Sequence, residues 1–75
     1  MKQVRQLTGI IERENDGFVA SCPELDVVSQ GDSIEDARKN LIEAVELFLE
    51  CADESEVQRR LRNELYITPI EVSVG

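Results

Sequence analysis

Two segments near the start of the chain alternate apolar and polar residues in the way that predicts a β-hairpin. Residues 4–14 alternate imperfectly and are rich in β-branched side chains, which favours a strand. An Asn-Asp-Gly sequence follows at residues 15–17, and these residue types accept the positive φ angles of a tight turn. Residues 18–22 then predict a returning strand with Phe18 and Ala20 on one face.

A loop, a short strand and the start of a helix are predicted next. Pro23 ends the second strand because proline has no N–H to donate to a neighbouring strand. Residues 27–30 form a short third strand that Gly31 closes. Ser33 is followed three residues later by Asp36, which is a variant of the capping box, so we expect a helix to begin after Ser33.

A long amphipathic helix is predicted over residues 34–51. At about 100° per residue, one continuous arc collects the apolar side chains of Ile34, Ala37, Leu41, Ala44, Val45, Phe48 and Leu49. Leu47 falls outside this arc, among polar side chains. Single exposed leucines are common on protein surfaces, so Leu47 is either one of these or a contact with another subunit or a partner.

The last part of the chain predicts a short helix and a final strand. Residues 53–63 place Val57 and Leu61 one helical turn apart. Residues 66–74 alternate well after Pro69, which confines the first half of this strand to a sheet edge or a bulge. This final strand, close to the end of the chain, leaves a strand edge that can pair with another chain. We therefore expect an oligomer contact that involves Leu47, Ile70, Val72 and Val74.

Together these elements predict one α+β domain over residues 1–75. It is a two-layer sandwich in the order β-β-β-α-(short α)-β, with the helices on one face of a mainly antiparallel sheet. With 41% hydrophobic residues the core is thin, and a domain of this size buries only about 60% of its unfolded surface. Association buries more, so we expect a homodimer or a larger homo-oligomer.

The charge of the chain narrows the class of function. Its 16 Asp and Glu residues outnumber 8 Lys and Arg residues, which gives a net charge of −8, and no histidine is present. Binding to nucleic acids or to anionic membranes rests on clustered Lys and Arg, so we expect neither. Histidine is the commonest general base and metal ligand, and its absence argues against an enzyme and against a cofactor or metal site. The acidic balance favours a basic protein partner.

Cys22 and Cys51 have no metal-type spacing. No apolar run of the secretory kind follows the first residues, and no stretch approaches the ~20 apolar residues of a membrane span. We therefore expect reduced thiols in a cytoplasmic protein.

Acidic side chains gather in the predicted loops, at Asp16, Glu24, Asp26 and Asp32. They are either solvated loop acids, a surface that faces a partner, or a metal site, and no calcium-loop spacing supports the last. One basic cluster is interleaved with glutamates: Arg59, Arg60 and Arg62 with Glu54, Glu56 and Glu64. We expect local neutralisation on a helix surface, with phosphate binding as the alternative.

Several short motifs in order resemble the HicB-like antitoxin family. The hairpin turn reads Asp16-Gly17-Phe18, the next loop reads Cys22-Pro23-Glu24-Leu25, and the helix entry reads Ser29-Gln30-Gly31-Asp32-Ser33. Glu35-Asp36-Ala37 and residues 40–50 continue the pattern in an amphipathic helix. Each motif alone is weakly specific, but their order and spacing together are those of the family.

The resemblance implies a partly degenerate RNase H-like β-β-β-α-β domain that forms dimers or larger oligomers. It also implies neutralisation of a small basic HicA-like toxin, an RNA-cleaving protein, by covering its active surface. Many family members carry a C-terminal DNA-binding domain, whereas this sequence stops at Gly75, so we expect no DNA binding. Many also read Leu-Pro-Gly where this chain has Leu25-Asp26-Val27, which places it with the short, single-domain relatives.

The sequence therefore predicts a protein-binding module without catalytic residues. Asp16, Glu24, Asp26 and Asp32 are expected to lie on one rim of the domain and to contact a basic toxin. The alternatives are an orphan oligomer with no toxin partner, a small-ligand site between subunits, and a metal-dependent nuclease retained from an RNase H-like ancestor.

Overall fold

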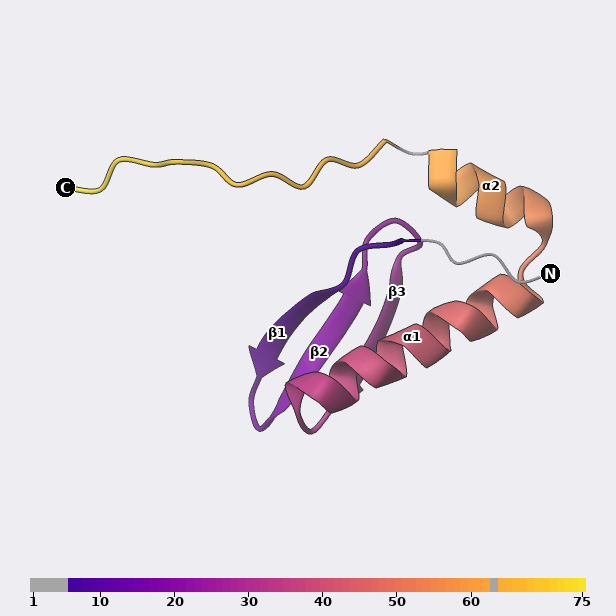
Figure 1. Cartoon of the computed structure of the whole chain (residues 1–75), viewed down its shortest axis with the longest axis horizontal. Coiled ribbons are helices and arrows are strands. Elements are labelled where there is room, and N and C mark those ends of the chain that lie inside the picture. Colours follow the sequence, from indigo (N-terminus) through magenta and orange to yellow (C-terminus); the bar gives the residue numbers. More distant parts are fainter. Residues whose placement is uncertain (1–5, 63) are drawn as a thin grey trace.

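The chain folds as one antiparallel sheet with a long helix on one face, followed by a short helix and an extended C-terminal segment (Figure 1). The computed structural model describes residues 6–62 and 64–75. The elements are β1 (Ile10–Glu14), β2 (Gly17–Cys22), β3 (Val27–Gly31), α1 (Ile34–Cys51) and α2 (Glu54–Arg62). The predicted α+β class is confirmed.

The sheet has the strand order β1-β2-β3, and both neighbouring pairs are antiparallel. Glu14 pairs with Gly17, so the hairpin turn consists of two residues. The positive φ angle, 55°, falls on Asn15, and the glycine joins the strand. The first strand starts at Ile10, six residues later than predicted, because residues 6–9 lie outside the ladder and residues 4–5 lie outside the described residues.

The start of α1 follows the capping signal in the sequence. The Asp36 backbone N–H donates to Ser33 Oγ at 3.0 Å, which satisfies one of the amide groups that a first helical turn leaves without a partner. Glu35 and Asp36 lie in that first turn, where the helix dipole favours negative charge. The predicted helix limits are confirmed at both ends.

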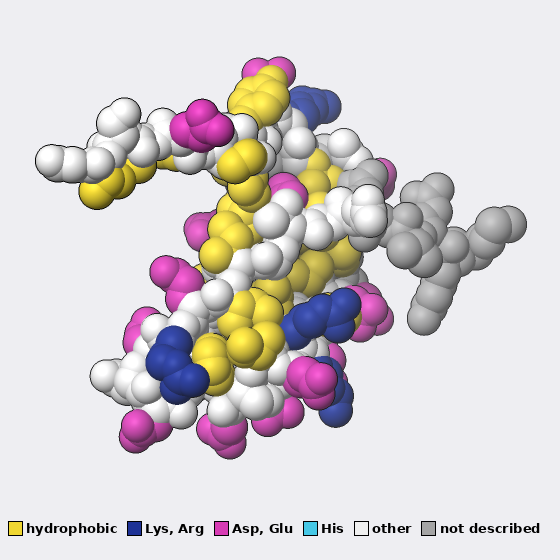
Figure 2. All heavy atoms as spheres, turned by 60° about the vertical axis from the view of Figure 1, so that its left-hand side comes forward, with side chains coloured by type: hydrophobic (Ala, Val, Ile, Leu, Met, Phe, Trp, Pro, Cys, Tyr) yellow, Lys and Arg dark blue, Asp and Glu magenta, His cyan; other side chains and the backbone are white. Residues whose placement is uncertain are grey.

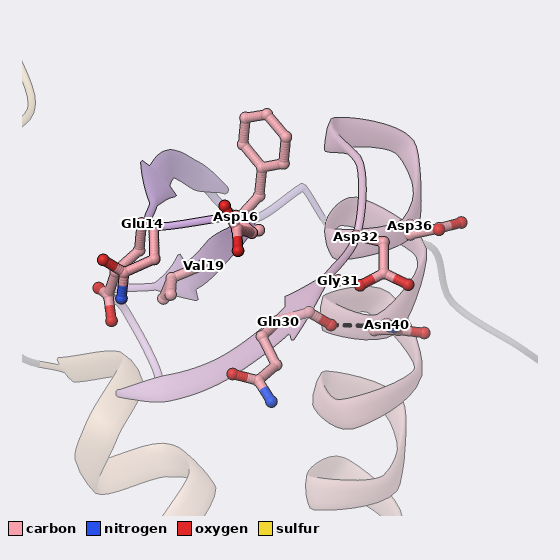
Figure 3. A pocket seen from close by; sticks show the side chains of 11 residues that line it. Glu14, Asp16, Val19, Gln30, Gly31, Asp32, Asp36 and Asn40 are labelled. Atoms are coloured by element: carbon pink, nitrogen blue, oxygen red, sulfur yellow. Dashed lines mark hydrogen bonds between the residues drawn. The ribbon is translucent and has the colours of Figure 1, made fainter.

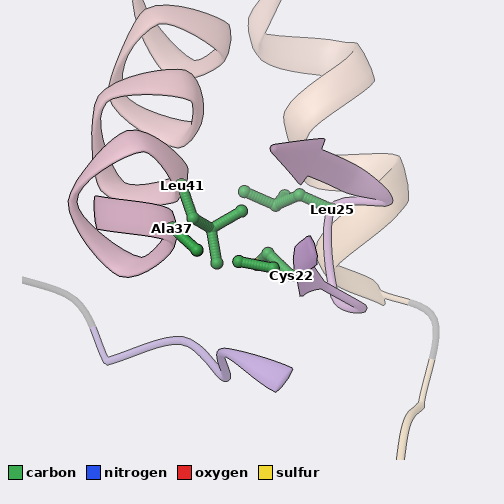
Figure 4. Packing of buried hydrophobic residues seen from close by; sticks show 5 residues of the cluster. Cys22, Leu25, Ala37 and Leu41 are labelled. Atoms are coloured by element: carbon green, nitrogen blue, oxygen red, sulfur yellow. The ribbon is translucent and has the colours of Figure 1, made fainter. Parts of the chain in front are cut away.

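The core lies between the sheet and α1 and is small (Figure 4). Its buried members are Ala20, Cys22, Leu25, Ala37 and Leu41. Leu25 comes from the β2–β3 turn, is fully buried, and was not anticipated as a core residue. The predicted apolar arc of α1 is buried only along its centre, since Ile34 at one end is 55% exposed.

The first turn of α1 rests against the end of β3 at Gly31. A Cβ atom on Gly31 would lie 2.4 Å from the Ala37 backbone N and 2.7 Å from the Asp36 carbonyl carbon. Both contacts are with backbone, which cannot rotate away as a side chain does. Only glycine therefore allows this approach of helix and strand.

Arg60 holds α2 against the rest of the fold. Its guanidinium donates to the Leu25 carbonyl oxygen and lies 4.6 Å from the centre of the Phe48 ring. Glu56 forms ion pairs with Arg59 and Arg60. The predicted local neutralisation is confirmed for these two arginines, and Arg60 has a structural role as well.

The predicted final strand at residues 66–74 is not formed. Residues 64–75, named the C-terminal arm below, have no strand assignment and are exposed throughout. The arm runs extended from the end of α2, passing one end of the sheet without joining it (Figure 1). Its alternation is suited to a strand, but a strand also needs a neighbour to hydrogen-bond with, and the described part of the chain provides none for the arm.

No helix within residues 6–62 and 64–75 is long and apolar enough to cross a membrane.

The close approach at Gly31 makes a substitution test possible. We expect Gly31→Ala to lower the free energy of unfolding by about 1–3 kcal/mol, because the new methyl group forces β3 and α1 apart. Gly9→Ala is the control, since its Cβ would lie at an ordinary contact distance of 3.6 Å from Leu41 Cδ2. Urea denaturation measures both variants, and equal losses would show that the approach at Gly31 is not the constraint.

Candidate functional site

Four acidic residues are among those that line an open hollow of about 560 Å³ at one end of the sheet (Figure 3). Glu14 and Asp16 come from the β1–β2 hairpin, Asp32 follows β3, and Asp36 lies in the first turn of α1. All four residues are exposed. No lysine or arginine is among the described residues that line it. We call this site the acidic hollow.

The antiparallel register brings these acids together. Phe18 at the start of β2 pairs with Gly31 at the end of β3, so the residues just before β2 and just after β3 lie at the same end of the sheet. A Cβ on Gly17 would lie 3.0 Å from the Gly31 carbonyl oxygen, so the two strands also approach closely there. Asp16 and Asp32 therefore belong to one site.

One wall of the acidic hollow is fixed by a contact between the two layers. Asn40 Nδ2, on α1, donates to the Gln30 carbonyl oxygen at 2.8 Å. Figure 3 shows this bond joining β3 to the helix beside Asp32 and Asp36. The site is thus built on a strand and a helix held together, in addition to the hairpin turn.

Glu24 and Asp26 lie at the opposite end of the sheet, in the β2–β3 turn. Cys22 pairs with Val27 there, whereas the acidic hollow lies at the Phe18–Gly31 end. The prediction that all four loop acids share one rim was wrong. Successive turns of an antiparallel meander lie at opposite ends of the sheet, and the spacing of the acids along the chain does not reveal this.

The Glu24 carboxylate is occupied by hydrogen bonds within the chain. It accepts from the Thr8 backbone N–H at 3.0 Å, from Thr8 Oγ1 at 2.6 Å and from Cys22 Sγ at 3.6 Å. Burial raises the pKa of Glu24, but the hydrogen bonds, led by the Thr8 hydroxyl, outweigh burial and lower that pKa below its ordinary value. Glu24 thus ties the segment before β1 to the β2–β3 turn.

The surface around Glu24 and Asp26 is mixed in charge. A second hollow of about 380 Å³ is lined there by the two acids together with Glu56, Arg59 and Arg60. Asp26 is exposed and has a positive φ of 56°. With arginines beside the acids, this end offers a weaker attraction to a cation than the acidic hollow does.

Cys22 has the environment of a structural thiol. It is buried in the core, and burial raises its pKa more than the backbone hydrogen bond at Leu25 lowers it. The nearby Glu24 carboxylate raises the pKa further. Among the described residues, no group of three or more His, Cys, Asp and Glu side chains is arranged to hold a metal ion.

The residues predicted for an oligomer contact are all exposed in the single chain. Leu47 on α1 is 59% exposed, and Ile70, Val72 and Val74 on the arm are 71–92% exposed. Figure 2 shows hydrophobic side chains gathered across the middle of one face and beneath the arm, with Asp and Glu around its margin. The structure thus leaves apolar side chains exposed on this face that a second molecule can cover.

The Thr8–Glu24 contact predicts a pH-dependent loss of stability. We expect Glu24→Gln to lower the free energy of unfolding by about 1–3 kcal/mol at neutral pH, because an amide oxygen replaces a charged acceptor of three hydrogen bonds. The folded pKa of Glu24 is lowered, so the unfolded chain takes up this proton first, and acid favours unfolding. The stabilisation is therefore complete above the ordinary pKa of 4.5 and is lost as pH falls through the folded value.

Denaturation of both proteins between neutral pH and pH 3 measures this effect, and the gap between the wild type and Glu24→Gln should narrow in acid. Asp26→Asn, two residues away in the same turn, is the matched control, because asparagine tolerates the same positive φ. A gap that stays constant down to the lowest pH would contradict the role of the Glu24 charge.

Comparison with known proteins identifies relatives of nearly the same length. A UPF0150 protein of Synechocystis sp. is 37% identical over 75 residues, which covers 97% of this chain and 94% of the relative. A UPF0150 protein of Helicobacter pylori is 35% identical over 68 residues, which covers 89% of this chain and 94% of the relative. No protein-family model and no solved structure matches the chain. At this identity over almost its full length, the chain belongs to the UPF0150 family.

Proposed function

We propose that this protein is a HicB-like protein-binding module, without catalytic activity, that neutralises a small basic RNA-cleaving protein of the HicA type. In this proposal the domain has a partial RNase H-like fold and acts in the cytoplasm. It covers the active surface of the toxin and keeps RNA from reaching it. The module requires no cofactor and no metal.

The acidic hollow is the observation that carries the proposal. Glu14, Asp16, Asp32 and Asp36 are among the residues that line one open hollow, and no described Lys or Arg residue lines it. A toxin that cleaves RNA binds phosphates through Lys and Arg side chains. Exposed carboxylates at fixed positions can occupy the sites of those phosphates, and their charge also accelerates the encounter with a basic protein.

The position of the HicB-like motifs supports the same reading. The motifs at Asp16-Gly17-Phe18 and at Gly31-Asp32-Ser33 are far apart in the sequence, yet both contribute to the acidic hollow. Gly31 permits the approach of α1 that brings Asp36 to this site. Two of the motifs that carry the resemblance therefore also build the site proposed to bind the partner, whereas Cys22-Pro23-Glu24-Leu25 lies at the opposite end of the sheet.

The proposed contact with the toxin includes only two of the four loop acids predicted from the sequence. Of the four predicted loop acids, only Asp16 and Asp32 line the acidic hollow, and both are exposed. Glu24 supports the fold through Thr8, and Asp26 lies at the other end of the sheet beside arginines. A partner that covers the acidic hollow does not need to reach either of them.

The test uses the product of a short basic reading frame adjacent to this gene as the binding partner. We expect Asp16→Asn combined with Asp32→Asn to weaken binding by about 10- to 100-fold in calorimetry, because two charge contacts are lost. Protection of a labelled RNA from that partner should fall in parallel.

Glu43→Gln combined with Glu46→Gln is the matched control, since it removes the same charge from the exposed outer face of α1. We expect this control to bind within about threefold of the wild type, as for charges outside a contact. Equal losses of affinity in the two double variants would show that binding depends on net charge and not on the acidic hollow. If the wild type does not bind the partner, the alternative of an orphan oligomer is favoured. Cleavage of RNA by the chain alone with Mg²⁺ or Mn²⁺ would refute the non-catalytic assignment.

A further inference from the structure

We propose that the C-terminal arm of one copy adds as a fourth strand to the free edge of β1 in a second copy, and that the exchange is reciprocal. The paired part of the arm is residues 70–74. The proposal rests on the sheet edges, the exposed surface and the composition of the arm, and it does not depend on the identity of any toxin.

The single chain exposes more surface than a compact protein of its mass. Its accessible area is 6643 Å², whereas a compact chain of this mass exposes about 4,700 Å². The radius of gyration is 14.6 Å, against about 11 Å expected for 75 residues. The surplus of about 2,000 Å² exceeds the ~800 Å² that each partner buries in a stable interface of standard size.

The third strand, β3, is in closer contact with the rest of the chain than β1 is. The Gln30 carbonyl oxygen accepts from Asn40 of α1, and α1 packs mainly against β3 and β2. By contrast, β1 pairs with β2 alone among the described strands, and α1 packs least against it. The sheet therefore offers its free edge at β1.

Apolar side chains beside β1 are left partly uncovered. Ile11, which pairs with Ala20 of the core, is only half-buried. On α1, Ile42 and Leu49 lie about 180–200° around the helix from Asn40, the residue that faces β3. They therefore lie on the flank of α1 toward β1, and they are 42% and 37% exposed. A further strand next to β1 would cover all three.

The arm has the length and the pattern of such a strand. Pro69 cannot donate a hydrogen bond, so pairing starts after it, and residues 70–74 match the five residues of β1. Ile70, Val72 and Val74 alternate with Glu71 and Ser73, which gives one apolar face for the core side. Glu71 is the one charged side chain in residues 66–75.

A second copy is the occupant that these observations favour. Arg60 fixes α2 at the β2–β3 turn, and the arm leaves α2 along a path that stands clear of its own sheet (Figure 1). Within the described residues, each copy thus has an arm without a strand partner and a β1 edge without a neighbour. Two copies satisfy both at once through a two-fold arrangement, which closes and does not propagate.

The first experiment measures the mass of the full chain in solution by light scattering. We expect two chains, each of 8.5 kDa. Val72→Asp should raise the dissociation constant by about 100-fold or more, because each of two symmetric contacts would bury an unpaired carboxylate. Ser73→Asp adds the same charge to the opposite face of the arm and should remain dimeric.

The second experiment identifies which strand receives the arm. A nitroxide is attached to Ser73→Cys in a Cys51→Ser background, since Cys22 is buried. The nitroxide-labelled protein contains no ¹⁵N. It is mixed with a ¹⁵N-labelled copy that carries Cys51→Ser and no nitroxide. We expect broadening of the β1 amide signals, Ile10–Glu14, in the ¹⁵N-labelled copy.

Three outcomes would overturn the proposal. A monomer in light scattering, with no broadening in the ¹⁵N-labelled copy, would show that the arm does not pair with a second copy. A dimer without broadening of β1 would show a different interface. Equal dissociation of Val72→Asp and Ser73→Asp would show that the apolar face of the arm is not buried.

Discussion

The approach of α1 to the end of β3 at Gly31 is the constraint on which most of the fold depends. The Ala37 and Asp36 backbone atoms occupy the space that any larger residue at position 31 would need. Ser33 then caps the helix at that same point. Because the helix starts so close to the strand, α1 lies over β3 and β2, and Asn40 reaches the Gln30 carbonyl. The close contact of α1 with β3 and its slight contact with β1 both follow from this placement.

Signals that act over a few residues were sufficient to predict most elements. Ser33 and Asp36 located the start of α1, and the Asn-Asp-Gly sequence located the hairpin, although Asn15 and not the glycine takes the positive φ. Contacts that span the fold were missed. Glu24 reaches Thr8 across 16 residues, and Leu25 is buried from within a loop. Neither has a local signature, because each depends on which end of the sheet the turns occupy.

The same distinction between local signals and long-range contacts applies to the candidate site. Its residue types could be read from the sequence, but their grouping could not, since the register of the strands sends Asp16 and Asp32 to one end and Glu24 and Asp26 to the other. The predicted final strand failed for a related reason. Alternation in residues 66–74 describes a side-chain pattern, while a strand is completed only by hydrogen bonds to a neighbour, which the described part of the chain does not supply.

The net charge of −8 bears differently on the two proposed contacts. Like-charged copies repel, so they can associate only through a surface where charges are few and apolar area is large. The arm meets that condition, with a single charged side chain in residues 66–75. The acidic hollow has the opposite character. Its four acidic residues, with no Lys or Arg among the described residues that line it, oppose contact with a second copy and favour a basic protein. The distribution of charge thus assigns self-association and partner binding to two different surfaces. The net charge alone would not distinguish them.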